Sequence, residues 1–131
     1  MRKIITIPLV LSADDDYAPF MYTTMISILE NKYKRTFYIF YLFVPYNFSK
    51  NYEKIILDIN NKYKCSINFV YIKNAFEKII IKIPHITLTT FYRLLIGNLL
   101  PKDIDKCIYL DVDVCVNKDL TDLFKIDLKN N

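Results

Sequence analysis

Residues 4–11 read Ile-Ile-Thr-Ile-Pro-Leu-Val-Leu, a short and almost unbroken apolar run that stops at the polar residues 12–17. A strand with both faces covered reads as a continuous apolar run, so this stretch predicts a buried strand of a parallel sheet. Pro19 follows the polar residues, and Met21, Met25 and Ile28 come after it at helical spacing. Because proline is favoured in the first turn of a helix, the chain is expected to run strand, polar bend, helix.

The same alternation continues along the chain. Residues 37–44 predict a second buried strand that Pro45 closes, and Ser49 is suited to cap a helix with an apolar face. Residues 65–72 return to strand character. Residues 74–84 allow either a short strand or a buried loop, and the pattern does not choose between them.

The last third of the chain repeats the theme. A helical pattern starts at Thr87 or Thr89 and ends before Pro101, residues 106–110 predict a strand, and residues 119–124 predict a short capped helical turn. Helices that connect strands favour parallel neighbours. We therefore expect an α/β fold, an open and mainly parallel sheet with helices on both faces, in a single domain. In such sheets ligands bind at the carboxyl ends of the strands.

Composition excludes several classes of function. The chain has 131 residues, 53% hydrophobic, and its single glycine rules out a dinucleotide fingerprint or P-loop. Its single histidine, His85, rules out zinc sites built on paired histidines. The net charge of +4 comes from scattered lysines, so nucleic acid is not an expected partner. Three cysteines without a Cys-x-x-Cys spacing favour a reducing cytosol, and we expect no membrane-spanning helix.

Asp-x-Asp pairs occur at 14/16, 103/105 and 111/113, where chance alone predicts roughly one pair. The pair at 103/105 lies in a polar turn. Asp111 and Asp113 follow a predicted strand, and in an extended segment their carboxylates would point to the same side and share Mg²⁺ or Mn²⁺. Spacing alone equally allows both aspartates to end the strand and cap a turn. The apolar run before the pair favours the metal site, because carboxylates beside a buried strand are costly without a partner.

The first acidic cluster, residues 14–16, allows two interpretations. Aspartates before a helix are stabilised by the helix dipole, and composition favours this local role. The functional interpretation has an aspartate accept hydrogen bonds from a base or ribose while Tyr17 stacks on the ring. Arg93 is the cation best suited to hold a diphosphate, because a guanidinium binds phosphate through two donors; its alternative is an ordinary ion pair.

Four segments in order resemble the family 8 retaining glycosyltransferases, of the kind that build bacterial lipopolysaccharide. They read LVLSADDDYAP at 9–19, TFYRL at 90–94, LP at 100–101 with IYLDVDV at 108–114, and DLTDL at 119–123. The resemblance as a whole spans Ile5 to Phe124. The resemblance implies a GT-A fold, and transfer of a hexose from a UDP-sugar to a glycan or lipid-linked acceptor with retention of configuration and a requirement for Mn²⁺ or Mg²⁺. It also implies a cytoplasmic location, at most peripheral to the inner face of the membrane.

Position by position, the resemblance implies a donor site. It assigns uracil and ribose contacts to the first acidic segment, nucleotide-sugar positioning to Arg93, the metal to Asp111 and Asp113, and a ribose contact to the backbone of Val112. The residues of the first group are Ser12, Asp14, Asp16 and Tyr17. Asp16 stands where the family often has asparagine. Its carboxylate can still accept a hydrogen bond, but the N–H donor of an asparagine amide is lost.

One departure from the family concerns length. The family's third metal ligand, a histidine, and its acceptor-binding residues lie well beyond the second Asp of the pair, whereas 18 residues follow Asp113 here and none is histidine. We therefore expect a C-terminally incomplete, donor-binding half that binds UDP-sugars weakly and transfers little, with catalytic residues unknown. Its uncovered sheet edge favours self-association.

Two other classes of protein fit parts of the sequence. Residues 110–114 also resemble the nucleophile motif of haloacid-dehalogenase-like phosphatases, but the lysine and acidic residues that such enzymes need lie far downstream of that motif. A non-catalytic folded remnant or interaction module is the remaining alternative. Metal-dependent binding of UDP separates a donor-binding half from such a remnant.

Overall fold

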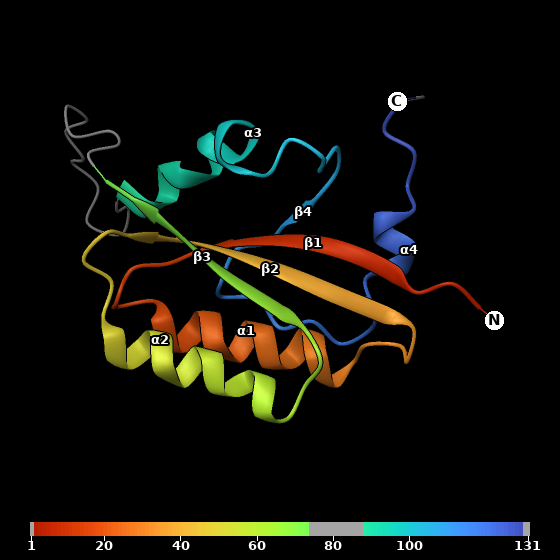
Figure 1. Cartoon of the computed structure of the whole chain (residues 1–131), viewed down its shortest axis with the longest axis horizontal. Helices are drawn as coiled ribbons and strands as arrows, with labels where there is room; N and C mark the ends of the chain where they lie inside the picture. The colour runs from red at the N-terminus through yellow and green to blue at the C-terminus, as the bar shows by residue number, and fades with distance from the viewer. Residues whose placement is uncertain (1, 74–87, 130–131) are drawn as a thin grey trace.

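The computed structural model describes residues 2–73 and 88–129. Within these ranges the strands form one parallel sheet in the order β3-β2-β1-β4 (Figure 1). The strands are β1 Ile5–Ser12, β2 Thr36–Pro45, β3 Ser66–Ile72 and β4 Ile108–Tyr109. The undecided stretch 74–84 and the single histidine, His85, lie outside the described residues.

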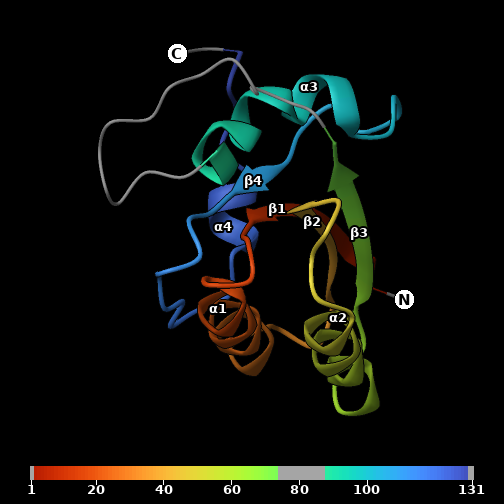
Figure 2. The same ribbon diagram turned by 90° about the vertical axis from the view of Figure 1, so that its left-hand side faces the viewer.

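Helices cover both faces of the sheet, as the alternation predicts. The helices α1 (Ala18–Glu30) and α2 (Lys50–Leu57) lie on one face, and the short helices η2 (Leu88–Leu95) and α3 (Ile96–Leu99) lie on the other (Figure 2). A 3₁₀ turn, η1 (Asp58–Asn61), extends α2, and α4 (Thr121–Phe124) comes near the end of the chain.

The strand β1 is the centre of both cores. Its residues from Ile7 to Ser12 are all buried, which confirms the prediction of a strand covered on both faces. Leu9 and Leu11 pack into the core shared with α1 and α2, whereas Val10 packs with Phe43 on the side of η2. Alternate side chains of one strand therefore reach two separate cores.

Local signals explain where the helices begin and end. Pro19 lies in the first turn of α1, where its missing N–H costs no hydrogen bond. Leu100 adopts an extended backbone before Pro101 and ends α3. Ser49 occupies the N-cap position of α2, but its side chain makes no capping hydrogen bond; its N–H donates instead to Asp15 Oδ1 at 2.9 Å.

Two elements differ from the sequence prediction. Residues 88–95 form a 3₁₀ helix instead of an α-helix, and α3 continues it for one turn. The predicted strand at 106–110 contracts to two residues, because β4 pairs with β1 only at Leu9 and Val10 before the chain turns at residues 112–113. The contraction leaves the acidic residues 111–113 beside the end of β1.

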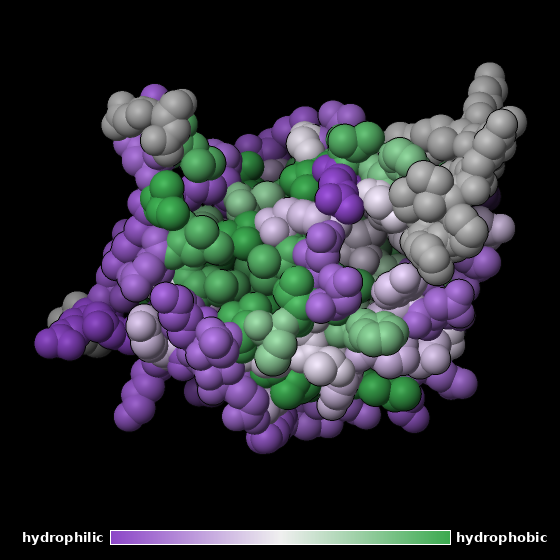
Figure 3. All heavy atoms as spheres, turned by 180° about the vertical axis from the view of Figure 1, so that it is seen from behind, coloured by the Kyte–Doolittle hydropathy of each residue, from purple (hydrophilic) through white to green (hydrophobic). Residues whose placement is uncertain are grey.

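An apolar area covers part of the face turned away from the viewer in Figure 1 (Figure 3). Near β4 and α4 the exposed apolar side chains include Leu123, Ile126 and Leu128. A hollow there is lined by Lys106, Cys107, Ile108 and Phe124 together with these three residues. Since β4 is an edge strand of the sheet, this apolar area lies beside a strand edge.

Candidate functional site

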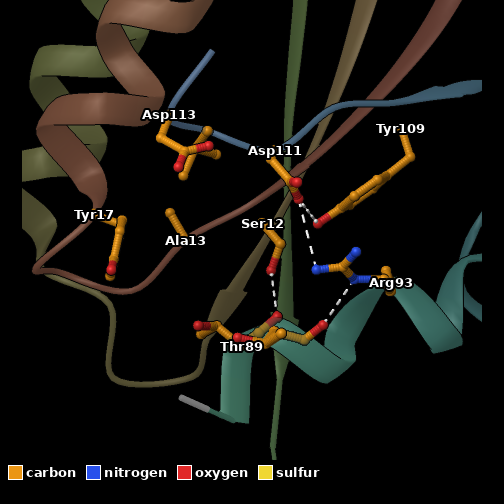
Figure 4. Close-up of a pocket in the computed structure, with 10 residues that line it drawn as sticks. Ser12, Ala13, Tyr17, Thr89, Arg93, Tyr109, Asp111 and Asp113 are labelled. Carbon is orange, nitrogen blue, oxygen red and sulfur yellow. Dashed lines mark hydrogen bonds and ion pairs between the residues drawn. The ribbon is translucent and has the colours of Figure 1, made fainter. Parts of the chain in front are cut away.

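A pocket opens where the carboxyl ends of β1 and β4 meet. Because the two strands run parallel with Val10 opposite Tyr109, the residues that follow each strand arrive at the same edge of the sheet. Helix η2 closes the third side (Figure 4). The pocket is lined by Ser12, Ala13, Tyr17, Thr89, Thr90, Arg93, Tyr109, Asp111, Val112 and Asp113.

Arg93 and Asp111 form the charged centre of this pocket. A guanidinium nitrogen of Arg93 lies 3.6 Å from Asp111 Oδ1, and the hydroxyl of Tyr109 donates to the same oxygen at 3.2 Å. The Arg93 Nε–H donates to the Thr90 carbonyl at 3.0 Å, and its guanidinium lies over the Tyr109 ring, 5.2 Å from the ring centre. Both of these contacts of Asp111 use Oδ1.

The protonation state of the Tyr109 hydroxyl follows from the groups around it. Burial raises the pKa of the Tyr109 hydroxyl and the Asp111 carboxylate raises it further, while Arg93 acts in the opposite direction. The hydroxyl therefore stays protonated at neutral pH and acts as a donor to Asp111. Its hydrogen bond fixes the direction of one carboxylate oxygen in the pocket.

Asp113 also lines the pocket, but the geometry before it differs from the extended arrangement predicted from its spacing. Val112 and Asp113 form a turn, with Val112 buried at 8% exposure and Asp113 exposed. In Figure 4 the Asp111 side chain points toward Arg93, and Asp113 lies on the side of Tyr17. The two carboxylates thus occupy neighbouring parts of one pocket wall.

The β1 side of the pocket contributes a hydroxyl and a ring. The hydroxyl of Ser12 donates to the Thr89 carbonyl at 3.0 Å and ties the end of β1 to the start of η2. Tyr17 is partly exposed, and its ring makes a tilted contact with Phe20, with 5.7 Å between ring centres. One face of the pocket therefore offers an aromatic surface beside polar groups.

Asp14 and Asp16 do not line this pocket. They line a separate hollow with Asp15, Pro45 and Asn47. Asp14 Oδ1 accepts a hydrogen bond from the Tyr17 N–H at 3.1 Å, the local helix-start role that composition favours. The structure thus brings six of the predicted donor-site residues together and leaves these two in the adjoining turn.

Several pocket residues escaped the sequence prediction. Thr90 and Tyr109 lie within the segments that resemble the family, and Thr89 lies just before one of them, but none of the three is assigned a role from the sequence. Their place in the pocket depends on how η2 packs beside β4. One signal could have identified Tyr109. It lies two residues before Asp111, and side chains two residues apart in an extended strand point to the same side. A further missed residue, Thr24 of α1, contacts the turn from behind and is treated below.

The chemistry of the donor set is that of an oxygen ligand site. In residues 2–73 and 88–129 there is no group of three or more His, Cys, Asp or Glu side chains placed to hold a metal ion. Two exposed carboxylates offer oxygens to a hard divalent cation, and the phosphate oxygens of a ligand would complete its shell. The adjacent Arg93 offers donors to the same phosphates.

Comparison with known proteins agrees with this geometry. A family model described as Glycosyl transferase family 8 matches residues 8–131. The chain belongs to glycosyl transferase family 8. This family 8 chain is 31% identical over 127 residues to a Haemophilus influenzae protein named as a glycosyltransferase, covering 95% of this chain and 37% of that protein. It is 48% identical over 50 residues to the glycosyltransferase GlyE of Streptococcus pneumoniae, covering 38% of this chain and 12% of GlyE.

Solved structures share the fold. The galactosyltransferase LgtC, in a complex with donor and acceptor sugar analogues, superposes with a TM-score of 0.83 at 28% identity, covering 95% of this chain and 44% of LgtC. The bifunctional glycosyltransferase WbbM gives a TM-score of 0.78 at 27% identity, covering 97% of this chain and 22% of WbbM. The GT-A fold predicted from the resemblance is therefore confirmed, and the family 8 chain spans less than half the length of these relatives.

Every helix in the described ranges 2–73 and 88–129 is too short or too polar to cross a membrane. Cys65, Cys107 and Cys115 are all free thiols. Burial raises the pKa of Cys65 to about 11, although Lys32 acts in the opposite direction, and burial also raises the pKa of Cys107. These two thiols are therefore poor nucleophiles at neutral pH.

Proposed function

We propose that the pocket at the carboxyl ends of β1 and β4 binds the UDP-sugar donor of a retaining hexosyl transfer, with a divalent cation, Mn²⁺ or Mg²⁺. The single observation that carries the proposal is the meeting of Asp111 and Asp113 with Arg93 on one pocket wall. Membership of family 8 supports the reaction class.

The charges of the wall favour a diphosphate bound through a cation. Carboxylates alone would repel phosphate, whereas a cation held by Asp111 and Asp113 would join the two anions. When bound, such a cation supplies positive charge that stabilises the departing nucleoside diphosphate. Arg93 contributes donors to the phosphates from its place beside Asp111, and Tyr109 holds Asp111 in place.

The nucleoside is proposed to lie on the β1 side of the pocket. Tyr17 offers its partly exposed ring to uracil, and Ser12 and the backbone of Val112 lie beside the space for ribose. Asp14 and Asp16 are proposed to accept hydrogen bonds from base or ribose out of the adjoining turn. Together these residues make the chain a nucleotide-sugar-binding domain.

The remaining parts of the proposal concern the whole reaction. We propose a glycan or lipid-linked acceptor, as in lipopolysaccharide synthesis, and a cytoplasmic location at most peripheral to the inner face of the membrane. The three free thiols support a reducing compartment. Because the matched relatives are more than twice as long, we expect the 131-residue polypeptide by itself to bind the donor and to transfer little sugar.

Calorimetry with UDP tests the proposal. Titrations in the presence of MnCl₂ are expected to give a clearly higher affinity than titrations in EDTA, and UMP should show a smaller gain because it lacks the second phosphate. Equal affinity in manganese and EDTA would contradict a cation-bridged diphosphate. Sugar transfer by the polypeptide alone at a rate typical of complete enzymes would contradict the expectation that it binds the donor but transfers little sugar.

A second candidate role, self-association or another protein contact, rests on the apolar area near β4 and α4. Leu123, Ile126 and Leu128 are exposed there beside a strand edge. Apolar surface next to an unpaired edge favours association with a second chain. Sedimentation over a range of concentrations tests this, and Leu128→Lys should reduce any dimer that forms; a monomer at every concentration would exclude self-association.

A further inference from the structure

Helix α1 carries a row of polar side chains on a face that is otherwise part of the core. Thr24 and Ser27 of α1 and the C-cap residue Asn31, at spacings of three and four residues, lie on one side of the helix, and we call these three residues the polar row of α1. Thr24 is buried at 1% exposure between the core residues Met21 and Ile28. A polar residue at such a position requires hydrogen-bond partners.

The partners are backbone groups of the segment that contains the acidic turn. Thr24 Oγ1 lies 2.7 Å from the Val112 carbonyl oxygen and 2.8 Å from that of Val114. The Val116 N–H donates to Ser27 Oγ at 2.9 Å, and Asn31 Nδ2 donates to the Val116 carbonyl at 2.9 Å. Every second residue from 112 to 116 is thereby bonded to α1.

The polar row of α1 thus supplies hydrogen bonds that a neighbouring strand would otherwise give to the backbone of this segment. The segment leaves the sheet after Tyr109, and its backbone groups at 112, 114 and 116 bond to the polar row instead. The Val112 and Val114 carbonyls share the single hydroxyl hydrogen of Thr24. Buried carbonyls left without a donor would be costly. The row therefore holds the segment against the helix.

The two carbonyls in contact with Thr24 belong to the peptide before Asp113 and to the peptide after Val114. Holding both ends of this two-residue stretch restricts the backbone dihedrals of Asp113 and Val114 and therefore the direction of the Asp113 side chain. Asp113 is exposed, so packing does not hold its carboxylate. We infer that Thr24 is a positioning residue: its hydroxyl holds the Val112 and Val114 carbonyls so that Asp113 faces the same pocket as Asp111. This inference rests on the proposed function of the pocket.

The position of Thr24 relative to the ligand separates this role from direct binding. Thr24 does not line the pocket, since its hydroxyl reaches the turn from the α1 side. Loss of the hydroxyl is therefore expected to act through the turn at residues 112–113 and to weaken mainly the cation-dependent part of UDP binding. Binding of the nucleoside on Tyr17 and Ser12 should not change.

Thr24→Val removes the hydroxyl and keeps the shape, and Thr24→Ser keeps the hydroxyl. Thr23→Val is the matched control, because Thr23 is the preceding residue of the same helix, is exposed, and bonds only locally to the Pro19 carbonyl. UDP affinity is measured by calorimetry in MnCl₂ and in EDTA. Amide hydrogen exchange is followed for the peptide covering residues 111–117.

We expect Thr24→Val to lower UDP affinity in manganese by about tenfold, the size of effect seen when groups that orient metal ligands are removed, and to leave the affinity in EDTA unchanged. Exchange at residues 111–117 should be faster. Thr24→Ser should restore both values, and Thr23→Val should match the unsubstituted chain.

Each other outcome has a defined meaning. A Thr24→Val chain with unchanged manganese-dependent affinity overturns the positioning role while the proposed function stands. A fall of equal size in manganese and in EDTA also overturns it, because that result indicates general destabilisation. If the unsubstituted chain shows no manganese dependence, the proposed function fails and the positioning role fails with it.

Discussion

Two acidic segments with the same Asp-x-Asp spacing serve different ends in this molecule. At residues 14–16 the carboxylates bond backbone N–H groups: Asp14 accepts from Tyr17 and Asp15 accepts from Ser49. At residues 111–113 the contacts are instead with side chains, since Asp111 meets Arg93 and the Tyr109 hydroxyl. Spacing is identical, and the surrounding groups decide what each carboxylate can do.

The two segments differ in how much of each carboxylate is free to bind a ligand. A carboxylate that accepts backbone N–H bonds organises the start of a helix, and part of its hydrogen-bonding capacity is taken up. A carboxylate at a pocket wall beside a cationic side chain is available to a ligand that brings its own charge. Substitutions at both segments and at the groups around them test this contrast, in decreasing order of effect.

The largest effect is expected from Asp113→Asn. Replacing one of two carboxylates halves the charge offered to a cation, so manganese-dependent UDP affinity should fall by at least about 100-fold, more than removal of an orienting group costs. Calorimetry in MnCl₂ measures it, with EDTA titrations expected to stay unchanged. Asp105→Asn, in the third Asp-x-Asp pair, is the matched control, and a similar loss there would contradict the assignment.

A third aspartate, Asp119, is buried and has a purely structural environment. Asp119 is 5% exposed and accepts hydrogen bonds from the Tyr33 N–H, the Tyr38 hydroxyl and the Thr121 N–H. Asp119→Ala leaves these donors unpaired and should lower the free energy of unfolding by about 2 to 3 kcal/mol. Urea denaturation measures the change; Asp122→Ala, on the exposed side of α4, should change stability by less than about 0.5 kcal/mol.

The same residue predicts a dependence on pH. Burial acts to raise the pKa of Asp119, but hydrogen bonds from Thr121, Tyr33 and Thr36 outweigh it, and the pKa lies below its ordinary value. A lowered pKa stabilises the fold above about pH 4 and the benefit is lost as pH falls below that. Denaturation between pH 6 and pH 3 should show stability falling, and Asp119→Asn should flatten the decline. An equal slope in both chains would exclude Asp119 as its source.

A smaller effect is expected from the first acidic segment. Asp16→Ala should lower UDP affinity by about tenfold, the cost of one hydrogen bond from a charged acceptor, and by the same factor in MnCl₂ and in EDTA. Asp113→Asn differs, because its loss of affinity is expected only in MnCl₂. Calorimetry in MnCl₂ and in EDTA distinguishes the two cases. A loss confined to manganese would assign both acidic segments to the cation and remove the distinction between them.

The smallest effect concerns Arg93, which shares an oxygen of Asp111. In Arg93→Met that oxygen gains freedom to bind a cation, so manganese alone should bind about two- to fivefold more tightly, the range of an exposed ion pair. UDP affinity in manganese should fall because donors to the diphosphate are lost. Manganese relaxation measurements and calorimetry report the two values separately, and parallel changes in both would contradict the shared use of Asp111.

Much of the fold could be predicted from local pattern. The apolar run at 4–11, Pro19 and the apolar face of α1 predict the first strand and helix to within a residue or two. The 3₁₀ form of residues 88–95 could not be predicted, because residues three apart, such as Phe91 and Leu94, share a face in both kinds of helix. The contraction of β4 also escaped prediction, since pairing depends on how far β1 extends beside it.

The site divides in the same way. Asp111 and Asp113 stand out in the sequence because they follow a buried strand, and the structure puts both on the wall of one pocket. Thr24 stands out only as a polar residue on an apolar helix face, a weak signal when 88 residues separate it from its partner Val112. Pairs this distant in sequence become visible only when the fold brings them together.

The order of strands and helices, the acidic residues at the strand ends and the resemblance to family 8 were all determined by the sequence itself, because burial patterns and turn residues are local properties. The tertiary structure alone decided which aspartates share a pocket with Arg93 and which bond backbone N–H groups. The physical reason is that a carboxylate is defined chemically by the donors and charges within a few ångströms, and here those groups come from distant parts of the chain.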